Sequence, residues 1–275
     1  MNSQPLRQPA IFIPHGGGPC FFMDWTWGPA DTWESTRKFL EGLAASLPET
    51  PKVLLVISGH WEEPTFTAGT AASPQLIFDY SGFPEHTYRL TWPAPGDPAL
   101  AQRVAGILNK AGVPSALHPS RGYDHGVFVP LKIAFPEAQI PVVTLSLAAE
   151  ANGSFDPALH IAAGRALAPL RDEGVLIVGS GMSFHNLRAY LRPETREAAH
   201  AFDEWLTHAA ESPASQRDAL FAQWQSAPHA RFSHPREEHL VPLFVAAGAG
   251  GEAAGKRIFT HEPMGAAISA YRFDG

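Results

Sequence analysis

The chain has 275 residues, of which 45% are hydrophobic and 17% are charged, so it can bury a sizeable core and wholesale disorder is excluded. Its 20 Lys and Arg against 27 Asp and Glu give a net charge of -7, which, without basic runs, argues against nucleic acid as the main partner. The single cysteine, Cys20, excludes intrachain disulfides and cysteine-rich zinc or iron–sulfur sites.

The predicted elements alternate between strands and helices. Runs that are apolar throughout predict buried strands, and apolar stripes at helical spacing predict helices. In chain order we expect a strand at residues 10–14, a helix at 32–45, a strand at 53–58, a helix at 98–111, strands at 140–147 and 175–179, a helix at 194–211 and a weaker strand at 257–260. This alternation predicts one three-layer α/β domain over residues 1–275, with a mostly parallel or mixed central sheet flanked by helices.

Two long segments separate these elements. Residues 62–95 are rich in Pro, Gly and aromatics, and we expect either a functional cover or a hairpin at the sheet edge. Residues 212–234 are polar and are expected to be irregular. A further helix is expected to open at His234 and Pro235 and to run through residues 240–247, because proline suits a first helical turn.

No hydrophobic signal core is visible at the N-terminus, and no apolar run approaches the roughly 18 residues that a membrane span needs. We therefore expect a cytoplasmic protein without a membrane partner.

Three expected strands each lead into a histidine flanked by glycine. The pairs of strand and histidine are residues 10–14 with His15, residues 53–58 with His60, and residues 175–179 with His185. In open α/β sheets, ligands bind in the crevice outside the carboxyl ends of the strands. Neutral imidazole is the commonest metal ligand in proteins, so these histidines predict a shared site, although one such histidine alone would more often be a packing residue.

Two further clusters contain histidine. One is Tyr123-Asp124-His125-Gly126, and the other spans residues 234–239. In the second cluster His234 is interpreted as a helix cap, whereas the spacing leaves open whether Glu238 or His239 points inward. The remaining histidines are expected at the surface or in packing contacts.

The glycine-rich run at residues 15–18 also suggests chemistries other than metal binding. His-Gly-Gly-Gly is similar to the oxyanion-hole motif of lipases and esterases, but no serine lies in a G-x-S-x-G elbow, Ser180 included. The dinucleotide and P-loop glycine motifs are also absent. A thiol nucleophile would have to be Cys20, for which a small core residue is the favoured interpretation. A mononuclear metal site remains.

Seven stretches, in order, cover nearly the whole chain: PHGGGP at 14–19, SGHW at 58–61, GFPEHTYRLTWPAPGDPALAQRV at 82–104, GYDHGVFVPL at 122–131, PVVTLSL at 141–147, GSGMSFHNLR at 179–188 and EEHLVPLFVAAG at 237–248. Together they resemble the class III extradiol ring-cleavage dioxygenases, in their DOPA 4,5-dioxygenase-type branch. The resemblance implies a central sheet with helices on both sides. It also implies that His15, His60 and His239 bind the metal, that His185 is the acid–base catalyst, and that His125 lines the pocket for substrate and oxygen.

The third ligand position departs from part of the family. Relatives that cleave protocatechuate have a glutamate there, whereas this chain has His239, with Glu238 beside it. Two histidines and one carboxylate are typical of non-haem Fe(II) oxygenases, and three histidines also suit catalytic zinc. We expect Fe(II) for activity and Zn(II) in the protein as isolated.

The expected function is an extradiol dioxygenase of aromatic compound catabolism that inserts both atoms of O₂ into a catechol. The alternative is a zinc-dependent hydrolase using the same three histidines, and a third interpretation is a metal-carrying binding protein. Aromatic side chains in residues 62–95, together with Phe21, Phe22 and Trp25, are candidates to enclose the substrate ring. The expected partners are a small catechol and O₂, with no nucleic acid, and a homo-oligomer is compatible with these expectations.

Overall fold

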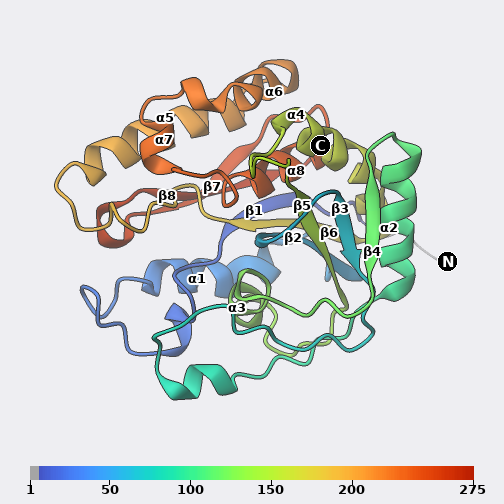
Figure 1. Cartoon of the computed structure of the whole chain (residues 1–275), viewed down its shortest axis with the longest axis horizontal. Helices are drawn as coiled ribbons and strands as arrows, with labels where there is room; N and C mark the ends of the chain where they lie inside the picture. The colour runs from blue at the N-terminus through green and yellow to red at the C-terminus, as the bar shows by residue number, and fades with distance from the viewer. Residues whose placement is uncertain (1–5) are drawn as a thin grey trace.

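A computed structural model describes residues 6–275 of the chain (Figure 1). Its strands form one mixed eight-stranded sheet in the order β4-β3-β5-β2-β6-β1-β8-β7. The strands are β1 (Ala10–Pro14), β2 (Val53–Glu63), β3 (Phe66–Gly69), β4 (Ser115–His118), β5 (Val142–Ala148), β6 (Val175–Gly181), β7 (Lys256–His261) and β8 (Ile268–Phe273). The predicted α/β class with a mixed central sheet is confirmed.

The centre of the sheet is parallel. β2 pairs in parallel with both β5 and β6, and β6 pairs in parallel with β1, while β8 joins β1 antiparallel. Both faces of these central strands are covered: in β2, Leu55 and Ile57 belong to one hydrophobic core and Leu54 and Val56 to the other. A strand buried on both faces is apolar at every position, which explains why the apolar runs identified it.

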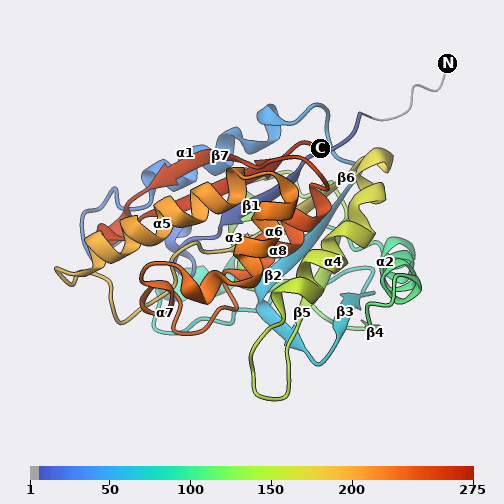
Figure 2. The ribbon, with the colours of Figure 1, turned by 90° about the horizontal axis from the view of Figure 1, so that it is seen from above.

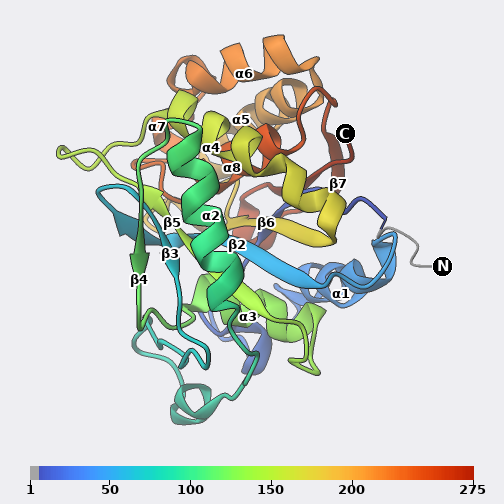
Figure 3. The ribbon, with the colours of Figure 1, turned by 90° about the vertical axis from the view of Figure 1, so that its right-hand side faces the viewer.

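Helices cover both faces. On one face lie α1 (Glu34–Leu43) and α3 (His125–Ala134); on the other lie α2 (Pro98–Lys110), α4 (Pro157–Leu167), α5 (Thr195–Glu211), α6 (Ala214–Ala222), α7 (Ala230–Ser233) and α8 (Val241–Ala249). Seen from above, α4, α5, α6 and α8 lie over the sheet (Figure 2). Helix α2 packs beside β3 and the edge strand β4 (Figure 3). The sheet thus lies between two helical layers.

Some boundaries follow directly from sequence chemistry. Helix α2 begins where expected, because the Asp97 side chain accepts a hydrogen bond from the Leu100 backbone N–H and Pro98 occupies the first turn. Strand β2 is longer than predicted: it continues through His60 to Glu63, with its register against β5 shifted between Ile57 and Glu62. His60 therefore lies in an irregular part of a strand instead of beyond its end.

Two expectations between residues 212 and 247 are wrong. Residues 212–234 are largely helical, because they contain α6 and α7. The helix expected to open at Pro235 begins only at Val241, and Pro242 is the proline in its first turn. Residues 234–240 instead form turns, which leaves His239 immediately before α8.

Residues 62–95 do not form the expected hairpin, because their one complete strand, β3, pairs with β4 and β5 instead of with another strand of the same segment. Residues 66–69 form β3 near the edge of the sheet, and the rest is an irregular cover with a short 3-10 helix at Glu85–Arg89. The cover packs on α3, with the Phe78 and Phe128 ring centroids 5.7 Å apart. Within residues 6–275, no helix combines the length and the apolar character needed to cross a membrane.

Candidate metal centre

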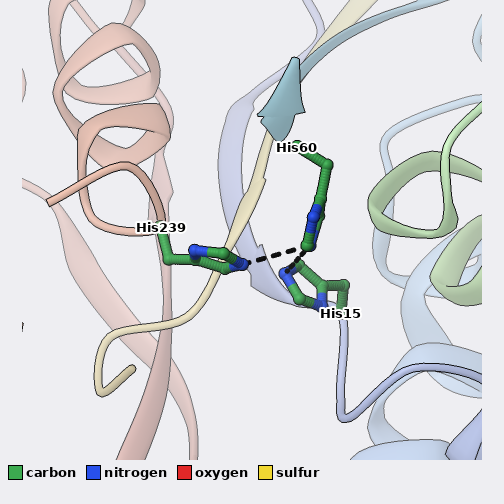
Figure 4. A group of neighbouring side chains, drawn as sticks. All are labelled: His15, His60 and His239. Carbon is green, nitrogen blue, oxygen red and sulfur yellow. Dashed lines mark hydrogen bonds between the residues drawn. The ribbon is translucent and has the colours of Figure 1, made fainter. Parts of the chain in front are cut away.

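Three histidines from distant parts of the chain meet at the carboxyl side of the central strands (Figure 4). His15 directly follows β1, His60 lies in the irregular part of β2, and His239 precedes α8. The His60 Nε2 atom lies 3.3 Å from Nε2 of His15 and 3.1 Å from Nε2 of His239. The structure therefore brings together the three residues that the resemblance implies as ligands.

Backbone contacts fix the positions of these histidines. The His15 backbone N–H donates to the Gly181 carbonyl at 3.1 Å, and the Met182 N–H donates to the His239 carbonyl at 3.0 Å. A Cβ atom at Gly181 would lie 2.1 Å from the His239 carbonyl oxygen. Glycine at the last position of β6 is therefore required, because the segment carrying His239 passes directly against the strand end.

The outer nitrogen of each ring faces an oxygen atom. Nδ1 of His15 lies 2.8 Å from the Gly16 carbonyl, and Nδ1 of His239 lies 2.9 Å from Glu238 Oε1. Nδ1 of His60 faces Oδ2 of Asp79 at 3.5 Å. The carbonyl and the carboxylates can only accept, so Nδ1 of His15 and of His239 carries the proton and Nε2 presents a lone pair, and the charge of Asp79 favours the same tautomer in His60.

Three converging lone pairs form a donor set for a cation. Burial, reinforced by the neighbouring histidines, lowers the pKa of His15 and of His239 well below the ordinary value, and burial likewise lowers the pKa of His60. The rings are therefore neutral, as metal ligands must be. With metal–nitrogen distances of about 2.1 Å, ligand nitrogens lie about 3.0 Å apart at 90° and about 3.4 Å apart at a tetrahedral angle. The observed separations of 3.1 and 3.3 Å fit one ion bound by three imidazoles.

His125 lies beside this cluster and is held by Asp79. Its ring centroid is 3.9 Å from that of His60. Asp79 Oδ1 accepts both the His125 backbone N–H, at 2.9 Å, and its Nδ1–H, at 2.8 Å. Burial raises the pKa of Asp79, but the hydrogen bonds and charge of His125 outweigh it and hold this pKa at about 2, so the carboxylate is ionised.

Sequence reasoning missed Asp79. The available signal was compositional: it is the only acidic residue between Glu63 and Glu85, in a stretch rich in aromatics. Its distance of 46 positions from His125 gave no hint of their contact.

His185 lies on the opposite side, against His239. The two rings stack with centroids 3.4 Å apart and an interplanar angle of 18°. Oε1 of Glu238 lies 3.2 Å from Nδ1 of His185, in addition to its bond to His239. Glu238 thus faces the outer nitrogen of His239, away from the Nε2 cluster. The spacing left open whether Glu238 or His239 points inward, and in the structure the inward-facing atom is Nε2 of His239.

Two other residues considered for the site, Cys20 and His234, are buried. Cys20 is buried beneath Gly16, where burial raises the pKa of its thiol, so the thiolate needed for nucleophilic attack is disfavoured. His234 is fully buried, with Nε2 bonded to the Ser183 carbonyl at 2.9 Å, and is a core residue instead of the expected helix cap.

The aromatic candidates separate into two groups. Phe21 and Trp25 are buried and pack edge-on against Trp33, so they support the loop after β1 from beneath. Tyr80, in the cover segment, stands edge-on to His125 with ring centroids 5.8 Å apart. Tyr80 is therefore an aromatic residue of the cover segment whose ring lies beside His125.

Comparison with known proteins agrees with this geometry. Residues 9–273 match the family model described as the catalytic LigB subunit of aromatic ring-opening dioxygenase. The chain is 36% identical over 275 residues to the 4,5-DOPA dioxygenase extradiol of Beta vulgaris, covering 98% of this chain and 97% of that protein. It is 36% identical over 281 residues to Dioxygenase tasH of Hapsidospora irregularis, covering 97% and 86%. None of these names supports the zinc hydrolase alternative.

A bacterial relative and a solved structure extend the likeness. The 4,5-DOPA dioxygenase extradiol of Escherichia coli (strain K12) is 34% identical over 256 residues, covering 88% of this chain and 85% of that protein. The crystal structure of uncharacterized protein JW3007 from Escherichia coli K12 superposes with a TM-score of 0.75 at 27% identity, covering 97% of this chain and all of that one.

Proposed function

Because the chain belongs to the family of catalytic LigB subunits of aromatic ring-opening dioxygenases, we propose that His15, His60 and His239 bind its catalytic metal ion. The protein is an extradiol ring-cleaving dioxygenase, an oxidoreductase that acts with a non-haem metal and O₂ on a small aromatic substrate. The observation that carries the ligand assignment is the convergence of three Nε2 atoms, with that of His60 lying 3.3 Å from that of His15 and 3.1 Å from that of His239.

The proposed ion in the active enzyme is Fe(II). When bound, Fe(II) would acidify a catechol hydroxyl and supply the electron exchange with O₂ that a closed-shell ring cannot provide alone. Zinc competes for the same three nitrogens, since Zn²⁺ binds such sites more tightly than Fe²⁺ by the Irving–Williams order. We therefore propose that the protein as isolated contains zinc in part of its molecules.

His185 is proposed as the acid–base residue. Its Nδ1 faces Glu238, so its Nε2 remains available to take the proton of a catechol hydroxyl and to return it when the ring opens. His125, whose Nδ1 donates to Asp79, is proposed to face the substrate and oxygen in the pocket with its Nε2. Both roles need an orientation that leaves Nε2 facing the site, which the two carboxylates support.

The substrate is proposed to be a catechol with an acidic side chain. Several relatives are named 4,5-DOPA dioxygenase extradiol, and DOPA is an amino acid with a catechol ring. A hollow of about 580 Å³ lies beside His185 and is lined by Arg188, Arg192 and Arg236, among other residues. Arg236 is paired with Glu62, whereas Arg188 and Arg192 form no ion pair within residues 6–275 and are free to bind a carboxylate.

The activity is tested by loading metal-free protein anaerobically with Fe(II) and then adding O₂ and a panel of catechols. Yellow ring-opened products are expected with Fe(II) and O₂ together, and a catechol bearing a carboxylate should give a lower KM than the same ring without it. Arg188→Ala should raise only the KM of the acidic catechol. Turnover by the zinc-loaded protein without oxygen would refute the dioxygenase assignment.

The ligand assignment is tested by metal content. His15→Ala, His60→Ala and His239→Ala are each expected to lower the bound metal, measured by plasma emission, from one ion per chain to a small fraction, because two imidazoles hold a divalent ion far more weakly. His160→Ala is the matched control, since that buried histidine lies in α4 and bonds to backbone only. Full metal in His239→Ala would show that another group is the third ligand.

A further inference from the structure

Asp79 and Glu238 occupy corresponding places on two sides of the histidine cluster. Each carboxylate faces the Nδ1 atoms of two histidines, one inside the cluster and one outside it. Asp79 lies 2.8 Å from Nδ1 of His125 and 3.5 Å from Nδ1 of His60. Glu238 lies 2.9 Å from Nδ1 of His239 and 3.2 Å from Nδ1 of His185.

This arrangement determines which nitrogen of each ring is protonated. An ionised carboxylate only accepts, so a histidine that faces it carries its proton on Nδ1 and exposes a lone pair on Nε2. Glu238 Oε1 lies within 3.2 Å of the Nδ1 atoms of both its histidines, and Asp79 Oδ1 accepts the backbone N–H of His125 as well as facing its Nδ1. All four Nε2 atoms are thereby left free of the carboxylates, two in the metal cluster and two beside it.

The same groups could be interpreted as two additional metal sites, because a carboxylate and two histidines lie within ligand reach in each. Their geometry favours hydrogen bonding. A second ion at Asp79 would require His60 to bind metal through both ring nitrogens, and the same would hold for His239 at Glu238. Asp79 Oδ1 is also already engaged by the backbone N–H of His125 at 2.9 Å.

We propose that Asp79 and Glu238 are paired positioning residues, each of which orients one metal-ligand histidine and one catalytic histidine. The proposal rests on the ligand and catalytic roles proposed above. A carboxylate that accepts a hydrogen bond from a metal-binding histidine raises the basicity of that ligand and fixes its ring orientation, and its loss typically costs about 10- to 100-fold in metal affinity or activity.

The distances predict a division of labour between the two carboxylates. Glu238 makes its shorter contact with the ligand His239, so its loss should weaken metal binding most. Asp79 makes its shorter contacts with the catalytic His125, and its contact with His60 is longer than an ordinary hydrogen bond, so its loss should affect turnover most.

The test is the change of each carboxylate to its amide, which keeps the shape but adds an N–H donor. Co(II) is titrated into metal-free protein without oxygen or catechol, and its visible absorption reports affinity and stoichiometry. We expect one Co(II) per chain, a dissociation constant raised about 10- to 100-fold in Glu238→Gln and less than tenfold in Asp79→Asn. With Fe(II) loaded to saturation, kcat should fall about 10- to 100-fold in Asp79→Asn.

Two amide variants serve as matched controls. Glu237→Gln changes a buried carboxylate next to Glu238 that pairs with Arg231, and Asp203→Asn changes one on α5 that pairs with Arg257. Both should lower only the melting temperature. If the two test variants behave like these controls, the carboxylates are merely structural and the proposal is wrong.

A wild-type stoichiometry above one Co(II) that falls by one in either test variant would equally overturn the proposal, in favour of additional metal sites. The proposed function would fail independently of this proposal if wild type and variants bind Co(II) with the expected affinities but the Fe(II)-loaded wild type opens no catechol ring.

Discussion

His185 differs from the clustered histidines because its Nε2 lies outside their cluster. Its side chain is 21% exposed, and it stacks on His239 without contributing Nε2 to the cluster. His185→Gln is expected to lower kcat about 10²- to 10⁴-fold, because a positioned general acid–base group contributes this much. Bound iron and melting temperature, measured on the same preparation, should stay near wild type, since a partly exposed side chain contributes little to stability.

Two outcomes would assign His185 differently. A loss of iron in parallel with kcat would make it a fourth ligand, and a near-normal kcat would remove it from the mechanism. Asn186→Ala is the control, because the side chain of this neighbouring residue bonds only to backbone, donating to the Phe232 carbonyl and accepting from the Arg188 N–H.

At the residue scale, the sequence was enough to identify the candidate histidines but not the carboxylates that contact them. His15, His60 and His185 were identified because glycine and an apolar run precede or follow each one. The roles of His125 and His239 came only from the resemblance, and all five assignments stay predictions. Asp79 could not be found by spacing, because its contact with His125 depends on how the cover segment folds onto α3.

At the element scale, helices α4 and α8 pack backbone against backbone through two glycines. A Cβ atom at Gly164 would lie 2.1 Å from the Val245 carbonyl oxygen, and one at Gly248 would lie 2.1 Å from that of Ile161. Gly164→Ala and Gly248→Ala are each expected to reduce the free energy of unfolding by about 1–3 kcal/mol, because the added methyl must push the helices apart. Urea denaturation measures this change.

Gly106→Ala is the matched control for this prediction. Gly106 also lies within a helix, α2, but no atom would lie within 4 Å of an added Cβ. This substitution should stabilise the protein by up to about 1 kcal/mol, because alanine is the better helix former. Equal effects at all three positions would show that helix propensity, and not close packing, decides the outcome.

Elements defined by local chemistry were predictable, and those defined by packing were not. The buried strands and the capped start of α2 carry their signals within a few residues. The start of α8 does not, because two prolines, Pro235 and Pro242, are each compatible with a first helical turn. Short strands such as β3 and β4 form at the edge of the sheet, with partly polar sequences, and were missed.

At the scale of the whole molecule, alternating strands and helices sufficed to predict a mixed sheet between helical layers, and the glycine-flanked histidines indicated the edge of the sheet at which the candidate metal centre lies. The order of the strands in the sheet could not be predicted from the sequence. The order β5-β2-β6-β1 depends on which strands share the two cores, a long-range property that no single segment carries.

Buried neutral histidines distributed through the molecule also make its stability depend on pH. Burial lowers the pKa of His160 to about 4 and that of His234 to about 3. Nε2 of His160 accepts the Ala148 backbone N–H, so protonation would break this bond. Between pH 6.5 and 4 the unfolded chain binds a proton at His160 that the folded chain does not, and the free energy of unfolding therefore falls as the pH is lowered.

The contribution of His160 can be isolated with His160→Gln, which removes the titrating group. One proton corresponds to about 1.4 kcal/mol per pH unit, so His160 should account for up to about 3 kcal/mol between pH 6.5 and 4. In metal-free protein, the unfolding free energy of the variant should decline less steeply over this interval, whatever its value at pH 7. Because His234 and the clustered histidines titrate alike in both proteins, equal slopes would show that His160 is not neutral in the folded state.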